Sequence, residues 1–210
     1  EVASKLTAQL LNDCFLSFLS EKNNDKQLHL CRNSRILQES ITQMIREVSD
    51  RICEIAKENH HYLGMGTTIV TALFNFSCNQ VIIHSVGDSR CYRIRSNRIE
   101  QLTEDQSYVW DLFKSGAITK NQILEHPRNN VIKMAVGITK DLEINSYVYE
   151  CRENDLYLLC TDGLTDMLYD HQIEKAIQSD TPLEVKGKQL IEMANNAGGK
   201  DNITLILISL

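Results

Sequence analysis

The sequence of 210 residues contains no hydrophobic run that approaches the length of a membrane-spanning helix. Positive charge is not in excess either, because 22 Lys and Arg stand against 28 Asp and Glu and the basic residues are scattered. The net charge of −6 argues against nucleic acid or an anionic membrane as the main partner. We therefore expect a main partner that is neither a nucleic acid nor an anionic membrane.

The seven cysteines form no Cys-x-x-Cys pair and follow no regular spacing. Several of them, such as Cys160, lie among apolar residues, where a reduced cysteine behaves as a small hydrophobe. This usage is typical of a reducing cytoplasm and gives no sign of a zinc cluster. The sequence also shows no Ser-His-Asp order and no setting for a cysteine nucleophile.

The remaining composition is that of an ordinary globular protein, with 42% hydrophobic and 24% charged residues. A chain of this length can bury a sizeable core as one domain. We see no internal repeat and no low-complexity linker. We therefore expect a single domain over residues 1–210.

Residues 155–166 carry the first sign of chemistry. Five apolar residues without alternation, 156–160, predict a strand buried on both faces. A helical pattern follows over 163–179, so Asp162 lies where the strand surfaces and Asp166 lies one helical turn further on. Two carboxylates this close repel each other unless a cation lies between them, and oxygen ligands suit Mg²⁺ or Mn²⁺. The alternative is that Asp162 only makes a turn and Asp166 is a solvated helix residue.

The apolar periodicity along the rest of the chain predicts two long helices, a meander of antiparallel strands, two further helices and a last strand. Ser34 is the expected N-cap of the second helix. A polar stretch over 21–27 is expected as a loop, and 105–135 as an excursion on the surface. The order of the elements indicates sheets covered by helices. The expected helices cover 1–19, 36–56, 163–179 and 182–197, and the expected strands cover 67–76, 81–86, 91–95, 98–102, 143–150, 156–160 and 202–210.

Three acidic turns stand out in this pattern. Asp88 follows one apolar strand, Asp162 and Asp166 follow another, and Asp201 comes just before the last strand. Each turn contains glycine, which allows close backbone approach, and strand ends of one sheet can converge on one rim. Any single one is explained as a turn, but the set of four favours a shared metal site. Carboxylate-bound divalent ions without a protein nucleophile suit hydrolysis of a phosphate ester by metal-activated water.

Six stretches of the chain form an ordered set. They are GMGTT (64–68), VGDSRCYRIR (86–95), LTEDQSYV (102–109), HPRNNVIKMAVG (126–137), LLCTDGLTD (158–166) and GGKDNIT (198–204). Each stretch alone is weak, but in this order and spacing they resemble the metal-dependent protein phosphatases, the type 2C-like PPM group in its bacterial form, over nearly the whole chain. The resemblance implies an α+β fold, a four-layer αββα sandwich of two antiparallel sheets flanked by helices. It also implies dephosphorylation of phosphoserine and phosphothreonine with two to three Mn²⁺ or Mg²⁺ ions and no phosphoenzyme.

The resemblance also implies roles for single residues. Asp162 and Asp201 resemble the ligands of the family's binuclear centre, and Asp88, Asp162 and Asp166 resemble the set that holds a third, weaker ion. Asn202 would steady the turn that carries Asp201. Gly163 is expected to support the site in a similar way, next to Asp162.

Residues 105–135 resemble the family's flap subdomain, which borders the active site and affects substrate choice. The implied partners are phosphoserine and phosphothreonine proteins that a cognate kinase modifies, and we expect a monomer. One departure is that the family's Asp-Gly-Met-Gly-Gly motif and a phosphate-gripping Arg precede a segment like residues 1–4, and the printed chain contains neither. We therefore expect residues 1–210 alone to be inactive.

Two alternatives to a phosphatase remain open at this point. The missing motif would also suit a pseudo-phosphatase that acts as a binding or regulatory module. Against it, a dead domain has no reason to keep four costly acids. The second alternative is a metal-dependent hydrolase of another phosphoester, such as a nucleotide, which the acidic balance and the lack of an aromatic base-stacking pocket disfavour.

Overall fold

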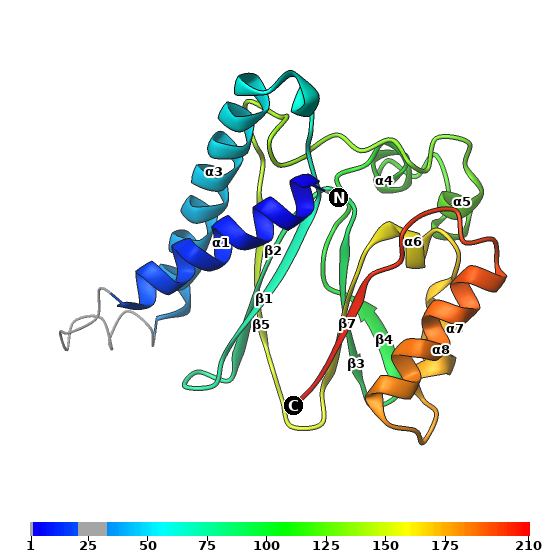
Figure 1. Ribbon diagram of the computed structural model, residues 1–210. Helices are drawn as coiled ribbons and strands as arrows, with labels where there is room; N and C mark the ends of the chain where they lie inside the picture. Colours follow the sequence, from blue (N-terminus) through cyan, green and yellow to red (C-terminus); the bar gives the residue numbers. More distant parts are fainter. Residues whose placement is uncertain (1, 21–32) are drawn as a thin grey trace. The chain divides into compact units, whose positions relative to one another are not determined.

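The computed structural model describes residues 2–20 and 33–210. The backbone contacts divide the chain into two compact units, Glu1–Gly87 with Met134–Cys151 and Asp88–Lys133 with Arg152–Leu210. Each unit contains one antiparallel sheet with helices packed on it (Figure 1). The predicted α+β class is therefore confirmed. The single domain over 1–210 and the flap over 105–135 stay predictions.

The first unit holds the sheet β1-β2-β5, in which both neighbouring pairs are antiparallel. Helix α3 packs on β2 and β5, and α1 packs on α3 (Figure 1). A single 3₁₀ turn, η1, follows α3. The elements of this unit are α1 (Val2–Ser20), α3 (Ser34–Glu58), η1 (His60–Tyr62), β1 (Ile69–Asn75), β2 (Gln80–Val86) and β5 (Asn145–Glu150).

Helix α3 forms because its apolar residues recur every three or four positions and give it one buried face. Its N-terminus is capped by Asn33, whose Oδ1 accepts the backbone N–H groups of Arg35 at 3.1 Å and Ile36 at 3.4 Å. The prediction that Ser34 is the cap is wrong, because Ser34 is already helical and buried. Its hydroxyl instead accepts a hydrogen bond from Asn75 Nδ2 at 3.3 Å.

The second unit holds the sheet β4-β3-β6-β7, again with every neighbouring pair antiparallel. Helices α7 and α8 contact each other and pack on β4 and β7 respectively. The excursion predicted over 105–135 contains the two short helices α4 and α5. The elements of this unit are β3 (Arg90–Arg95), β4 (Arg98–Gln101), α4 (Tyr108–Lys114), α5 (Lys120–Glu125), β6 (Leu156–Cys160), α6 (Asp162–Thr165), α7 (Asp170–Ile177), α8 (Leu183–Asn196) and β7 (Leu205–Ser209).

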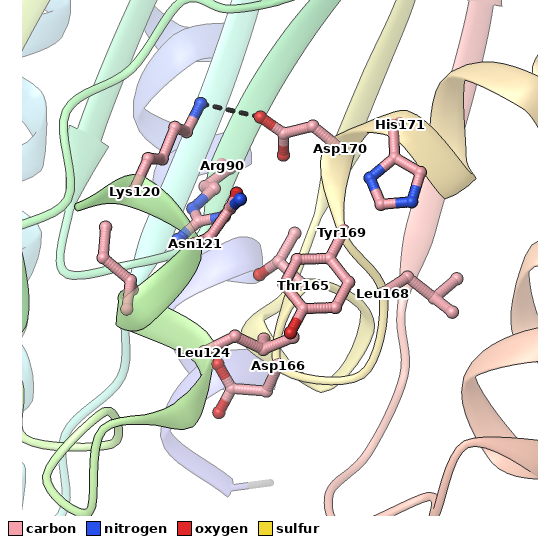
Figure 2. Close-up of a pocket in the computed structure, with 11 residues that line it drawn as sticks. Arg90, Lys120, Asn121, Leu124, Thr165, Asp166, Leu168, Tyr169, Asp170 and His171 are labelled. Carbon is pink, nitrogen blue, oxygen red and sulfur yellow. Dashed lines mark hydrogen bonds and ion pairs between the residues drawn. The ribbon is translucent and has the colours of Figure 1, made fainter.

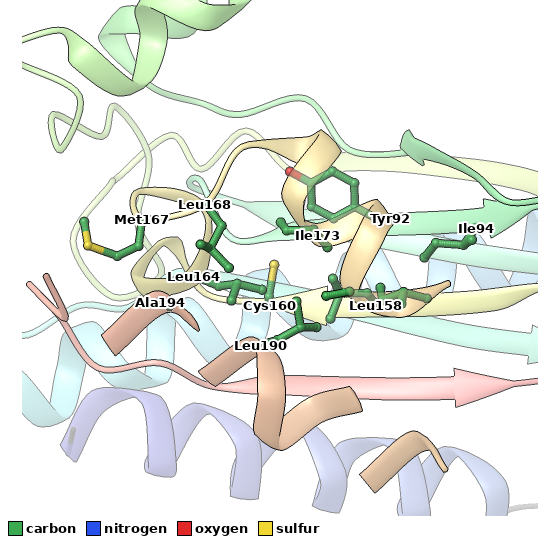
Figure 3. Packing of buried hydrophobic residues seen from close by; sticks show 12 residues of the cluster. Tyr92, Ile94, Leu158, Cys160, Leu164, Met167, Leu168, Ile173, Leu190 and Ala194 are labelled. Atoms are coloured by element: carbon green, nitrogen blue, oxygen red, sulfur yellow. The ribbon is translucent and has the colours of Figure 1, made fainter. Parts of the chain in front are cut away.

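The core of the second unit lies between this sheet and its helices (Figure 3). Tyr92 and Leu158 are paired across β3 and β6, are fully buried, and meet Ile173 of α7 and Leu190 of α8. The other face of β6 is buried as well, so the predicted two-sided burial of this strand is confirmed. A strand held on both faces is a rigid support for the residues that follow it.

The single helix predicted over 163–179 is wrong, because the structure has two helices separated by a break. Helix α6 is one turn long, and α7 starts afresh at Asp170. Between them Tyr169 is extended, with φ −72° and ψ 152°, and its N–H donates to Gln172 Oε1 at 2.9 Å. This side chain gives α7 its own N-terminal cap.

The remaining predicted elements are present, with ends that differ by up to about three residues, as is usual at the ends of helices and strands. The loop predicted over 21–27 lies outside the described residues. None of the helices in the described ranges is both long and apolar enough to cross a bilayer.

Candidate active site and metal centre

The strand register brings the three acidic turns to one edge of the second sheet. Arg90, the first residue of β3, pairs with Cys160, the last residue of β6, and Cys160 pairs with Leu205, the first residue of β7. Asp88 stands two residues before Arg90, and Asp162 stands two residues after Cys160. Because neighbouring strands are antiparallel, these turns emerge on the same side. The predicted convergence on one rim therefore occurs within one unit.

Asp201 reaches the same rim through a tight contact between two loops. It lies in the loop before β7, four residues before Leu205. The Thr161 hydroxyl donates to the carbonyl of Asn202 at 3.1 Å and accepts the Thr204 N–H at 3.1 Å. A Cβ atom at Gly163 would lie 2.4 Å from the Asn202 carbonyl oxygen, so only glycine allows this approach. These contacts hold the loop that carries Asp201 against the turn of Asp162 and Gly163.

Asp166 completes the single turn of α6. Its backbone N–H donates to the Asp162 carbonyl at 2.7 Å, so the predicted spacing of one helical turn is present although the helix ends there. Its Oδ2 accepts a long hydrogen bond, 3.4 Å, from the amide of Asn129. Asp162 itself accepts the N–H of Gly163 at 2.9 Å.

The four carboxylates are close enough to perturb one another. Burial, followed by the negative charges of Asp162, Asp105 and Asp166, raises the pKa of Asp88 to about 7. Burial followed by the charge of Asp162 raises the pKa of Asp166 to about 6. The pKa of Asp162 is also raised, first by burial and then by Asp201. At this edge of the sheet, several carboxylates therefore lie near one another and are partly buried.

The donor chemistry of this cluster fits Mg²⁺ or Mn²⁺, which prefer carboxylate oxygens. A divalent cation would offset the repulsion that raises these pKa values. Within residues 2–20 and 33–210, no three His, Cys, Asp or Glu side chains are close enough together to form a metal-binding group. Mg²⁺ commonly keeps several water ligands and binds through one or two carboxylates, so it does not require three of these side chains around one ion.

Behind the cluster lies a buried network that the sequence analysis did not anticipate. Arg90 donates from Nε and Nη2 to the carboxylate of Asp105, at 2.7 to 3.0 Å, and from Nη1 to the Tyr92 hydroxyl at 3.0 Å. The Tyr92 hydroxyl donates in turn to Asp170 Oδ1 at 3.0 Å. Asp105 belongs to one of the stretches that resemble the phosphatases, but no periodicity marks it as the partner of Arg90.

A cavity opens beside Asp166 in the same unit (Figure 2). It has a volume of about 210 Å³ and lies between α5 on one side and α6 with the start of α7 on the other. Lys120 of α5 donates to Asp170 Oδ2 at 2.6 Å across it, which links the two sides. The lining residues are Arg90, Lys120, Asn121, Ile123, Leu124, Thr165, Asp166, Leu168, Tyr169, Asp170 and His171.

Comparison with known proteins identifies the class of this fold and site. The serine/threonine phosphatase Stp of Listeria welshimeri is 35% identical over 208 residues, which cover 99% of this chain and 78% of that protein. The crystal structure of Stp1 from Staphylococcus aureus matches with a TM-score of 0.84 at 34% identity, covering 100% of this chain and 78% of that one. The catalytic domain of PstP, solved with two manganese ions, matches with a TM-score of 0.77 at 27% identity, covering 97% of this chain and 80% of that one. No protein-family profile matches the chain.

These similarities show that the chain is a protein serine/threonine phosphatase, a hydrolase. It belongs to the PPM family, the family that its motifs resemble. The predicted fold class and enzyme class are confirmed. The expectations about an upstream motif and about the inactivity of residues 1–210 alone stay predictions.

Proposed function

We propose that Asp88, Asp162, Asp166 and Asp201 hold two to three Mn²⁺ or Mg²⁺ ions, with which the enzyme hydrolyses phosphoserine and phosphothreonine. The observation that carries this proposal is the register of β3, β6 and β7, which brings acids from three distant parts of the sequence to one edge. The manganese ions in the PstP structure support the choice of metal, because that phosphatase shares this fold. Phosphoproteins modified by a cognate serine/threonine kinase are the proposed substrates.

The bound ions would activate a water molecule and neutralise the charge that develops on the phosphoryl oxygens. The task of the chain is to hold the carboxylates in fixed positions. Asp162 is fixed by the buried end of β6, and Gly163 lets the loop of Asp201 approach it closely. Asp88 is fixed at the start of β3, where the neighbouring Arg90 is locked by Asp105. Such rigid placement is what a site built on strand ends provides.

The first experiment measures phosphatase activity and metal binding of the full-length protein. Kinetics on a phosphothreonine peptide are recorded across a Mn²⁺ titration, and Mn²⁺ affinity is measured by calorimetry. We expect Asp162→Ala to lower kcat/KM by on the order of 1,000-fold, because it removes a ligand that no other residue replaces. The matched control is Asp180→Ala, which removes an exposed aspartate of the same unit and should leave both measurements unchanged.

Asp166→Ala separates the roles within the cluster. We expect it to raise the Mn²⁺ concentration needed for half-maximal activity by about 10- to 100-fold while some turnover remains at saturating metal. Equal and total loss in Asp162→Ala and Asp166→Ala would contradict a separate role for Asp166. If wild-type protein binds Mn²⁺ but shows no turnover on any phosphopeptide, the pseudo-phosphatase alternative replaces the proposed catalytic role.

A further inference from the structure

The cavity beside Asp166 is adjacent to the proposed site of phosphate hydrolysis, since it shares Asp166 with the acidic cluster. A substrate held at the cluster therefore has this space next to it. A volume of about 210 Å³ is below the range of about 300 to 1,000 Å³ that is typical of small-molecule sites. It suits a single amino-acid side chain with a few water molecules.

The charges of Asp170 and Arg90 at the cavity are already neutralised by fixed partners, and the charge of Asp166 is one that the proposed metal ions would neutralise. Both carboxylate oxygens of Asp170 accept hydrogen bonds, one from the Tyr92 hydroxyl and one from Lys120. Arg90 is only about 10% exposed and directs its guanidinium to Asp105 and Tyr92. These groups form a wall whose hydrogen bonds are made before any ligand arrives.

Lys120 differs from these groups because its hydrogen bond to Asp170 engages only part of its N–H donor capacity. An ammonium group has three N–H donors, and one of them reaches Asp170. The side chain is 44% exposed, so the other two can meet a partner at the cavity. Thr165, which is otherwise buried, and Asn121 add a hydroxyl and an amide to the same lining.

The opposite part of the lining is apolar. Leu124 of α5 lies beside Tyr169 at the cavity (Figure 2), while Leu168 behind them belongs to the buried core. A ligand side chain that fits this lining has an aliphatic stem and an anionic end. Aspartate and glutamate have this chemistry, and glutamine has the same shape without the charge.

We propose that this cavity is a specificity subsite for a residue flanking the phosphoserine or phosphothreonine, and that Lys120 makes an acidic side chain its preferred occupant. The proposal rests on the proposed function, because it requires the phosphorylated residue at the acidic cluster. The aliphatic stem of the occupant packs on Leu124 and Tyr169, and its carboxylate accepts from Lys120. Asp170 keeps its hydrogen bond from Tyr92 while Lys120 serves both carboxylates.

The test compares phosphothreonine peptides that differ at one position. Glu, Gln or Lys is placed in turn at each of the two positions on either side of the phosphothreonine, and kcat/KM is measured for the full-length protein with Mn²⁺. At one of these positions we expect Glu to exceed Gln by about three- to fivefold, the upper range for a half-exposed ion pair. Lys at that position should be the poorest of the three, because it faces a like charge.

Variants of Lys120 then assign the preference to this side chain. Lys120→Gln should bring the ratio of Glu to Gln peptide to about one, and Lys120→Glu should favour the Lys peptide. Lys120→Arg should keep the preference for Glu, since it keeps the charge. The matched control is Lys188→Gln, because Lys188 makes a 2.6 Å ion pair with Glu184 on α8 and does not line the cavity. Its ratio should equal that of the wild type.

Two outcomes overturn the subsite. The first is a wild-type enzyme that treats the Glu, Gln and Lys peptides alike at every position. The second is a Lys120→Gln variant that lowers kcat/KM for all peptides by the same factor, which would mean that Lys120 only ties α5 to α7. The absence of turnover on every peptide with Mn²⁺ would refute the proposed function instead, so the two failures are distinguishable.

Discussion

His84 makes the first unit sensitive to acid. It lies in the middle strand β2, is fully buried, and its Nε2 is 3.0 Å from the carbonyl oxygen of Gln38 in α3. To donate to a carbonyl, Nε2 must carry the proton of the neutral ring. Nδ1 has no hydrogen-bond partner among the described residues. A second proton would therefore create a buried cation with no partner at Nδ1.

The pKa of His84 is lowered from 6.5 to about 4, mainly by burial, while the hydrogen bond to Gln38 acts in the opposite direction. Between these two values the unfolded chain binds more protons at this site than the folded protein. The contribution of His84 to the free energy of unfolding therefore rises with pH in this window. This contribution is fully present above pH 6.5 and is lost as the pH falls toward 4. A shift of this size corresponds to about 3 kcal/mol in total, of which about 2 kcal/mol is lost at pH 5.

The measurement is urea unfolding at pH 7 and pH 5, followed by far-UV circular dichroism, for wild type and His84→Gln. Glutamine can donate to the Gln38 carbonyl and does not titrate in this range. Acidification should therefore cost the wild type about 2 kcal/mol more than it costs the variant. Asp88 and Asp166 have raised pKa values and act in the opposite sense, but they are the same in both proteins. Equal loss in the two proteins, or an NMR titration of His84 near pH 6.5, would refute the reasoning.

Two further substitutions test how the second unit is held together, each by urea unfolding. Gly163→Ala should lower the free energy of unfolding by about 2 kcal/mol, because its Cβ would meet the Asn202 carbonyl oxygen at 2.4 Å. The matched Gly187→Ala lies inside α8 with only a Leu205 methyl group at 3.3 Å, so it should be neutral or stabilising, and a similar loss in both would contradict this explanation. Asp155→Asn should cost about 3 kcal/mol, because it breaks a two-point pair at 2.7 Å between the buried Asp155 and the partly buried Arg95. A loss below about 1 kcal/mol would count against this explanation.

Much of the fold follows from short-range patterns in the sequence. The unbroken apolar run at 156–160 predicts a strand buried on both faces, and the period of 36–56 predicts a helix with one apolar face. The break between α6 and α7 could not be found in this way. It depends on Asp170, which is bound by Tyr92 from 78 residues away and by Lys120 from 50 residues away. The apolar period continues across the break because residues on both sides of it face the same core.

The candidate site also contains residues that sequence patterns mark and residues that they do not. Asp88, Asp162 and Asp201 could be predicted to converge because each stands next to one end of an apolar strand, and antiparallel strands bring alternate ends to one edge. Asp166 could be predicted because it lies one helical turn after Asp162. The network of Arg90 and Asp105 was missed because it depends on a side-chain pair 15 residues apart in which neither residue is marked by periodicity. Buried polar residues of this kind carry no signal until the partner is known.

The four acids and Lys120 are held in place by different parts of the structure, which separates the proposed chemistry from the proposed choice of substrate. The acids are fixed by strand ends and by a backbone contact that tolerates only glycine at 163, so substitutions there alter the placement of the cluster. Lys120 stands on a helix of six residues and donates to Asp170 Oδ2. The other oxygen, Oδ1, accepts from the Tyr92 hydroxyl, so that hydrogen bond does not depend on the residue at position 120. If the proposed subsite is correct, a change at Lys120 alters which phosphopeptides are preferred while the acidic cluster that we propose as the metal site keeps its support.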